Sequence, residues 1–289
     1  MRRNLLVLGE RYIEGDYGCI MAAGELHVDN SDIRSLYLAG ETSIHRSAVH
    51  KLFGAGEVNA NTLSFGNVKV VGEVNLQGFC KGDTLTITGD LSAEFLECRI
   101  LGSSLPGLKG KKGRFVWGNG HFTWQGKLKA VTFENLYALD LSGCDYEFNN
   151  IISSGFLSYN GEIACNNFYS FGGLCCEGIN AENITVIIND YISLQSVAGS
   201  NIRISKAFQA DRLFKSIPKS FKYKNFTSDC GIVYIPSIEG DAINIEYTRS
   251  DVVSGIDVVI GDLCIVDRVE YSGSVVISGK AVVNEVVRL

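Results

Sequence analysis

The sequence predicts an all-β fold, specifically a parallel β-helix with coils of about 16–18 residues. Three observations favour this fold. A short Gly-acid phrase recurs at nearly constant spacing, apolar residues around it alternate with a period of two, and the chain has 32 glycines but only 3 prolines. Many glycines with so few prolines indicate tight corners inside regular hydrogen-bonded structure.

The Gly-acid phrase sets the period of the repeat. Its glycines are Gly9, Gly24, Gly40, Gly56, Gly72 and Gly89, and the steps between their numbers are 15, 16, 16, 16 and 17. A later series, at Gly126, Gly143, Gly161 and Gly178, has slightly longer steps of 17, 18 and 17. A near-constant period indicates a repeat architecture. We interpret each glycine as a corner, where the chain bends more tightly than a residue with a Cβ allows.

The residues that flank each glycine indicate strands. Around Gly24, apolar residues stand two and four positions away on both sides, at Ile20, Ala22, Leu26 and Val28. A period of two is typical of a β-strand. The same slots are apolar in the next repeat, so we expect successive coils to stack at the inter-strand spacing of about 4.8 Å.

Two stretches interrupt the repeat and divide the chain. A Lys-rich stretch with several glycines reads as an exposed insertion, and a later basic stretch allows a short helix over 210–217 that ends at Pro218. The predicted segments are N-terminal coils 1–101, a Gly/Lys-rich insertion 102–120, continuing coils 121–205, a basic amphipathic segment 206–226 and a C-terminal β-helix segment 227–289.

Composition narrows the class of protein. Hydrophobic residues make up 46% of the chain and charged residues 20%, which predicts a folded protein, and the net charge of -6 argues against a nucleic-acid partner. The sequence shows neither a secretory signal nor an apolar run long enough to cross a membrane, so we expect a cytoplasmic protein. Nine scattered cysteines are then expected to be reduced and to serve as small apolar fillers.

The acids of the repeated phrase form a predicted outward column: Glu10, Glu25, Glu41, Glu57, Glu73 and Asp90. No helix follows them, so a phosphate-binding loop is excluded. Stacked carboxylates could bind a cation, with Glu25, Glu41, Glu57 and Glu73 as the candidates, but a solvated face is favoured. His27 could share that face with Glu25. The sequence shows no third ligand for His27, so neither a metal site nor a cofactor is predicted.

Enzymatic alternatives have weaker support. Acyltransferases with left-handed β-helices use tandem hexapeptides, and the sequence has one copy, IGDLCI at 260–265, with no histidine after His121. Polysaccharide-cleaving β-helices carry clustered acids or bases on one face, and this pattern is absent from the sequence. We predict no catalytic residue, and we keep an acyltransferase-like enzyme and a capped monomeric binding module as alternatives.

The C-terminal run IEGDAINIEYTRSDVVSGIDVVIGDLCIVDRVEYSGSVVISGKAVVNEVVRL resembles the end of bactofilin-like, polymer-forming cytoskeletal proteins of Gram-positive bacteria. The opening MRRNLLVLG is similar to the start of that family. The resemblance implies a right-handed parallel β-helix that assembles end to end without nucleotide. Because a β-helix end leaves strand edges and core unpaired, the expected contacts are Leu5, Val7, Val283, Val286 and Val287. Shorter coils, two insertions and the lack of Pro-rich tails depart from the family pattern.

The basic segment is the last candidate site. Its lysines alternate with apolar residues, which suits a membrane surface or a partner groove. Lys215, Lys219, Lys222 and Lys224 would make these contacts, at the inner face of the membrane or with another cytoskeletal or envelope protein. A segment that simply packs on the β-helix with its lysines in water fits the same pattern. The function that the sequence favours is a self-associating, non-catalytic scaffold.

Overall fold

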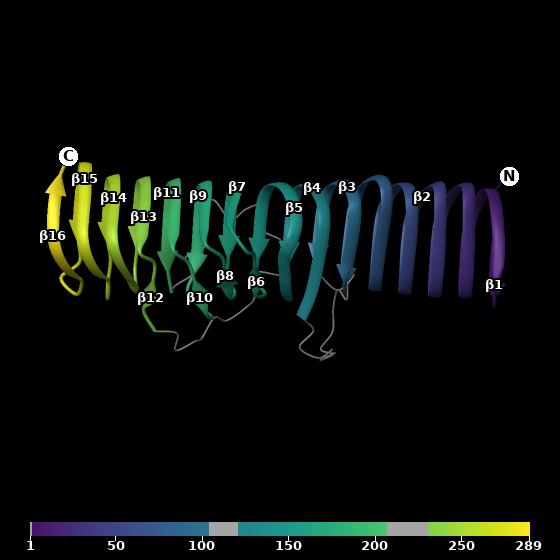
Figure 1. Cartoon of the computed structure of the whole chain (residues 1–289), viewed down its shortest axis with the longest axis horizontal. Helices are drawn as coiled ribbons and strands as arrows, with labels where there is room; N and C mark the ends of the chain where they lie inside the picture. Colours follow the sequence, from purple (N-terminus) through teal and green to yellow (C-terminus); the bar gives the residue numbers. More distant parts are fainter. Residues whose placement is uncertain (1, 104–120, 207–230) are drawn as a thin grey trace. The chain divides into compact units, whose positions relative to one another are not determined.

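The computed structural model describes residues 2–103, 121–206 and 231–289, and its regular structure in these ranges is β-strand throughout. The chain divides into two compact units, Met1–Asn149 and Asn150–Leu289, which we call unit 1 and unit 2. Neighbouring strands in each unit are parallel and stack coil on coil (Figure 1). The predicted fold class, an all-β parallel β-helix, is confirmed.

Unit 1 is built on one very long strand. The strands are β1 (Arg3–Leu8), β2 (Arg11–Thr88), β3 (Leu91–Ser103), β4 (His121–Asn135) and β5 (Ala138–Ser153), the last four residues of which belong to unit 2. β2 spans 78 residues because its pairing continues around several coils. β1 pairs with β2, β2 with β3 and β3 with β4, all in parallel. The corner glycines within β2, from Gly24 to Gly72, therefore turn the chain without ending the strand, whereas Gly9 and Gly89 lie between strands.

Unit 2 repeats this pattern with separate strands. Its longer strands are β7 (Glu162–Ser170), β9 (Gly178–Ile187), β11 (Ser196–Ser205), β13 (Ser237–Ile245), β14 (Thr248–Ile260), β15 (Ile265–Ile277) and β16 (Val282–Arg288). They pair in that order. The two-residue strands are β6 (Leu157–Ser158), β8 (Leu174–Cys175), β10 (Ile192–Ser193) and β12 (Val233–Tyr234). β6, β8 and β10 pair in sequence, and β12 pairs with β14.

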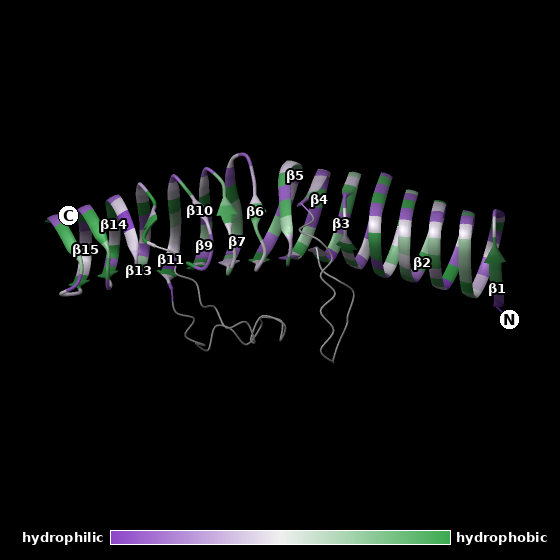
Figure 2. Cartoon of the chain, turned by 90° about the horizontal axis from the view of Figure 1, so that it is seen from below, coloured by the Kyte–Doolittle hydropathy of each residue, from purple (hydrophilic) through white to green (hydrophobic). Residues whose placement is uncertain are grey.

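The core of unit 1 lies inside the coils, as the alternation predicts. Within the coil that follows Gly24, the inward side chains Leu26, Val28, Ile33 and Leu36 are each at most 1% exposed. Figure 2 shows the resulting bands of apolar and polar residues along each coil. Removing this apolar surface from water stabilises the fold by about 25 cal/mol per Å².

The corner glycines are packed directly on one another. Gly40, Gly56 and Gly72 have φ angles of 131°, 130° and 138°, which side chains rarely adopt. A Cβ at Gly56 would lie 2.0 Å from the carbonyl oxygen of Gly40, and a Cβ at Gly72 would lie 2.0 Å from that of Gly56. The interpretation of these three glycines as corners is confirmed, and the close stacking adds a second reason for glycine. In the later series, Gly143 and Gly178 do not adopt a positive φ, so the interpretation does not hold for them.

Aromatic side chains fill the later coils of unit 1. The Trp124 and Phe133 rings meet edge to face, with centroids 5.8 Å apart, and Phe133 stacks on Phe148 at 4.9 Å. Trp124 is fully buried, and its Nε1–H donates to the carbonyl oxygen of Gly89 at 3.1 Å. This region, in which the glycines are spaced more widely along the sequence, thus also has larger core side chains.

Several sequence predictions fall partly outside the described residues. The first coils run two residues beyond their predicted end, because β3 continues to Ser103, and the rest of the insertion lies outside the described ranges. The predicted helix over 210–217 also lies outside them. Lys206, at the start of the basic segment, places its Nζ 4.6 Å from the ring centroid of Tyr247. None of the described residues forms a helix long and apolar enough to span a membrane.

Candidate functional site

Acidic side chains, a histidine and a tyrosine lie together on one outward face of unit 1. After each corner glycine, the chain presents outward side chains at the first, third and fifth positions. In consecutive coils these positions are Glu10, Tyr12, Glu14 and Glu25, His27, Asp29. The peptide N–H of Glu25 donates to the carbonyl oxygen of Gly9 at 3.1 Å, so the first coil sits in register over the second. We call this surface the acid face.

The acid face brings three ligand groups together. Single ligand atoms of Glu10, Glu25 and His27 all lie within 4.8 Å of one another. His27 Nε2 is 3.0 Å from a Glu25 oxygen and 3.9 Å from a Glu10 oxygen. The expectation that no three-ligand set converges around His27 is therefore wrong. Glu10 comes from the neighbouring coil, so the set exists only once the coils are stacked.

The His27 ring is held firmly, but its Nε2 has no hydrogen-bond partner. The ring stacks on Tyr12, with centroids 4.1 Å apart and planes 11° apart. Nε2 is buried from solvent and makes no hydrogen bond, although a Glu25 oxygen lies 3.0 Å away. Unsatisfied buried polar atoms of this kind are rare in folded proteins.

A cavity of about 500 Å³ opens beside this histidine. Tyr12, Glu14, His27, Asp29 and His45 contribute its polar lining. Asp29 Oδ1 is a second buried polar atom without a hydrogen-bond partner. The cavity thus joins two unsatisfied polar atoms on one strand, two residues apart.

The rest of the acid column has a different environment. Asn59 Nδ2 donates to Glu57 at 2.7 Å, and Asn75 Nδ2 donates to Glu73 at 3.2 Å and to Asn59 at 3.1 Å. Amide groups therefore hold these carboxylates. The structure assembles no metal-ligand group around Glu41, Glu57 or Glu73 within the described residues.

The C-terminal end of unit 2 leaves its core open. Val253, Val269 and Val286 form one inward ladder, and they are 0%, 0% and 45% exposed. Val283 and Val287, also predicted contacts, are half-buried. No strand pairs with the outer edge of β16 among the described residues. The last coil therefore presents an unpaired strand edge beside exposed core side chains.

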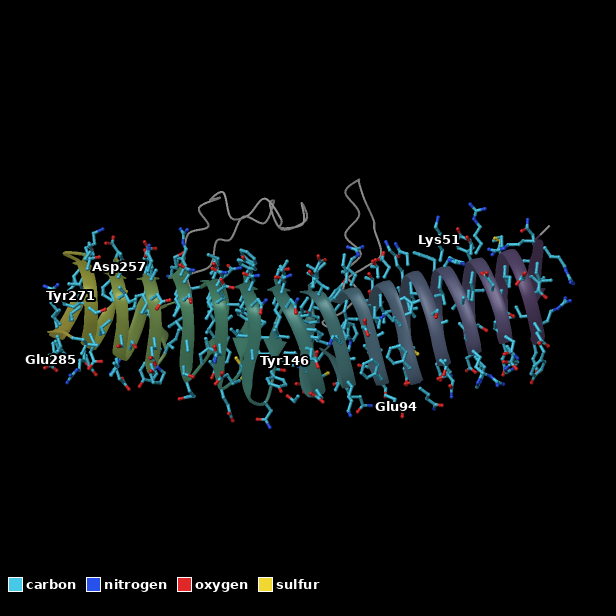
Figure 3. All side chains as sticks on the ribbon, turned by 90° about the horizontal axis from the view of Figure 1, so that it is seen from above. Lys51, Glu94, Tyr146, Asp257, Tyr271 and Glu285 are labelled. Carbon is cyan, nitrogen blue, oxygen red and sulfur yellow. The ribbon has the colours of Figure 1, made fainter. Side chains whose placement is uncertain are left out.

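A second ladder shows the same change. Ile245, Ile260 and Ile277 are 0%, 0% and 38% exposed along successive strands. Figure 3 labels Tyr271 and Glu285 in the same last coils. Two independent inward columns thus lose their cover at the end of unit 2.

The N-terminal end of unit 1 is different. Of the predicted contacts there, Val7 is only 2% exposed and Leu5 is half-buried. The outward Leu6 and Leu8 are instead 64% and 77% exposed. The outer edge of β1 has no paired strand within the described residues. This end therefore offers a strand edge with little exposed core.

An apolar column runs along the outside of unit 1. Leu6, Met21, Tyr37 and Phe53 occupy equivalent positions in successive coils and are 64%, 55%, 47% and 50% exposed. Lys51 lines a cavity next to Tyr37 and Phe53. In Figure 3, Lys51 and Glu94 extend from opposite sides of the unit 1 coils. The column is a second apolar surface besides the open end of unit 2.

Most of the described cysteines behave as the sequence predicts. Cys80, Cys98, Cys144, Cys176 and Cys264 are buried, and the described cysteines form no disulfides. Burial raises the pKa of the Cys98, Cys144 and Cys176 thiols to about 12. These thiols are therefore poor nucleophiles at neutral pH.

Glu134 in β4 gives a pH-dependent prediction. Burial raises the pKa of its carboxyl above the usual 4.5. Because the folded state then binds more protons than the unfolded state, stability falls as the pH rises through this window and stays lower at pH 7. We expect Glu134→Gln to raise the thermal midpoint at pH 7. Calorimetry should show the advantage disappearing below pH 4.5, and an equal advantage at both pH values would contradict this cause.

The predicted membrane or partner contacts Lys215, Lys219, Lys222 and Lys224 lie outside the described residues.

Comparisons with known proteins do not identify this chain: no protein family, curated protein or solved structure matches it. The candidate surfaces are therefore judged by their geometry and chemistry alone.

Proposed function

We propose that this protein is a non-catalytic, cytoplasmic scaffold that self-assembles end to end without nucleotide, and that the last coil of unit 2 makes the contact. The supporting observation is the open core at that end. Val286 is 45% exposed, although Val269, directly beneath it in the same inward slot, is fully buried. In the earlier coils of this ladder, the next coil covers the same slot.

A second copy of the chain is the best cover for this surface. An unpaired strand edge presents backbone donors and acceptors in a fixed spacing, and only another strand satisfies them all. The exposed core side chains beside the edge are matched in shape to a further coil. End-to-end contact would therefore bury apolar surface and complete hydrogen bonds at the same time.

The edge of β1 is the complementary surface. β1 and β16 are both parallel members of their ladders, and each has one free edge among the described residues. A contact between two different surfaces leaves each surface free at one end of the assembly, so it produces an open polymer unless the subunits close into a ring. The resemblance of both chain ends to bactofilin-like proteins supports this assembly. Recruitment to the inner face of the membrane by Lys215, Lys219, Lys222 and Lys224 belongs to the same proposal.

Val286→Lys should dissolve the assemblies. A lysine in this slot places a charge in the buried centre of the contact, where its desolvation is unfavourable. We expect negative-stain imaging and sedimentation of the purified wild-type protein, without nucleotide, to show long assemblies, and the variant to show short oligomers or monomers. Val282→Lys is the matched control, because Val282 lies on the same strand over the exposed, outward Ile265.

Two results would contradict the proposal. A wild-type protein that stays monomeric at all concentrations would exclude polymer formation. Assemblies that survive Val286→Lys but disappear with Phe53→Lys would place the contact on the outer apolar column of unit 1. Circular dichroism of each variant must match the wild type, so that a loss of assembly is not a loss of folding.

A further inference from the structure

We propose that Glu10, Glu25 and His27 bind one divalent transition-metal ion, with Zn²⁺ as the reference ion. Bonds of about 2.0–2.2 Å to such an ion place neighbouring ligand atoms about 3.0–3.6 Å apart. His27 Nε2 lies 3.0 Å from the Glu25 oxygen and 3.9 Å from the Glu10 oxygen. Small rotations of the exposed Glu10 and Glu25 side chains would bring all three ligand atoms to these distances.

His27 Nε2 is the ligand atom that most favours a bound cation. It is buried and makes no hydrogen bond, although a Glu25 oxygen lies only 3.0 Å away. A cation at Nε2 would satisfy this buried polar atom.

The ligand types select the class of ion. An imidazole nitrogen with two carboxylate oxygens suits Zn²⁺ and neighbouring transition metals, whereas Ca²⁺ and Mg²⁺ prefer oxygen ligands throughout. Three protein ligands leave coordination positions for water. The cavity beside His27 has space for such water, and Asp29, which lines it, has a buried Oδ1 without a hydrogen-bond partner.

Tyr12 positions the ligands before an ion arrives. Its ring stacks on His27 at 4.1 Å, and its hydroxyl donates to the carboxylate of Glu10. That hydrogen bond raises the pKa of Tyr12. Because Glu10 belongs to the first coil and the other two ligands to the second, a bound ion ties the two coils together. Metal binding is therefore expected to raise the thermal midpoint as well.

Zinc binding to the full chain tests the site. The protein is treated with a chelator, its accessible thiols are alkylated, and Zn²⁺ alone is titrated by calorimetry or equilibrium dialysis. We expect one ion per chain, and at least about tenfold weaker binding for His27→Gln and for Glu25→Gln. His50→Gln is the matched control, because His50 also lies 3.0 Å from a carboxylate, that of Asp32, but belongs to no three-ligand group in the described structure.

Co²⁺ provides a second measurement, because its visible spectrum reports a nitrogen and oxygen ligand set. The proposal is supported if the spectrum appears with the wild type and His50→Gln and is lost with His27→Gln. It is overturned if the wild type retains no Zn²⁺, or if His27→Gln and His50→Gln bind equally. Circular dichroism of the metal-free variants confirms that the coils remain folded. Assembly is measured on the same samples, so failure of either proposal is seen separately.

Discussion

Gly56→Ala is expected to lower the free energy of unfolding by about 2–5 kcal/mol. Two costs combine in this value. The φ angle of 130° is unfavourable for a residue with a side chain, and the new Cβ would lie 2.0 Å from the carbonyl oxygen of Gly40. That oxygen belongs to backbone held on both sides by parallel pairing, so it has little room to move. Urea denaturation followed by circular dichroism measures the loss.

Gly15→Ala separates the two costs. Gly15 also has a positive φ, 105°, but no atom lies within 4 Å of its hypothetical Cβ. We therefore expect only the backbone cost, about 1–3 kcal/mol. Equal losses for the two variants would show that glycine stacking contributes nothing.

Trp124→Ala is expected to cost about 3–5 kcal/mol from the cavity alone. Trp124 is 0% exposed and packs edge to face on Phe133, which in turn stacks on Phe148. Its loss also leaves the buried carbonyl oxygen of Gly89 without the Nε1–H donor at 3.1 Å. Thermal and urea unfolding of the full chain should both shift to a markedly lower midpoint.

Trp124→Phe tests the hydrogen bond separately from the ring. Phenylalanine keeps most of the apolar contact but has no donor for Gly89, so the expected loss is about 1–3 kcal/mol. If Trp124→Phe destabilised the protein as much as Trp124→Ala, the hydrogen bond and not the packing would dominate. If it had no effect, the hydrogen bond would contribute nothing.

The fold was predictable because its rules are local and repeat. The regularly spaced glycines fix one corner of each coil, and alternation around them fixes which side chains point inward. Ile20, Leu26 and Val28 were predicted on this basis and are buried. A second corner gave a weaker glycine signal, because glycine occupies it at Gly15 and Gly78 but not in the coils between them. There Asn30, Arg46 and Thr62 adopt positive φ angles of 44°, 43° and 59°.

From the sequence, Glu10 and Glu25 were placed in one column and His27 beside Glu25, but Glu10 was not counted as a ligand for His27. Glu10 and His27 belong to different repeats of the sequence, but stacking places their side chains 3.9 Å apart. Writing the repeats one above another would also have shown Tyr12 over His27. The missing hydrogen bond at His27 Nε2, in contrast, depends on ring orientation, which no sequence pattern encodes.

The two predicted assembly ends also proved unequal. Sequence reasoning treated Val7 and Val286 alike, because both are apolar residues of terminal strands. Val7 is 2% exposed and Val286 is 45% exposed. Exposure at an end depends on how neighbouring side chains lean across the core, and this is a property of packing in three dimensions. The division into two units after Asn149 left no signal that the sequence analysis recognised either.

Because the corner glycines stack on one another, the coils of unit 1 are equivalent structural modules. Each coil presents the same corner and the same inward slots to the coil on either side, so one coil can serve as the neighbour of any other. Duplicating residues 41–56 would lengthen the unit by one strand spacing, about 4.8 Å, and leave every existing interface chemically unchanged. Tandem duplication or loss of single coil-length blocks is therefore the easiest way for such a chain to change the length of the unit.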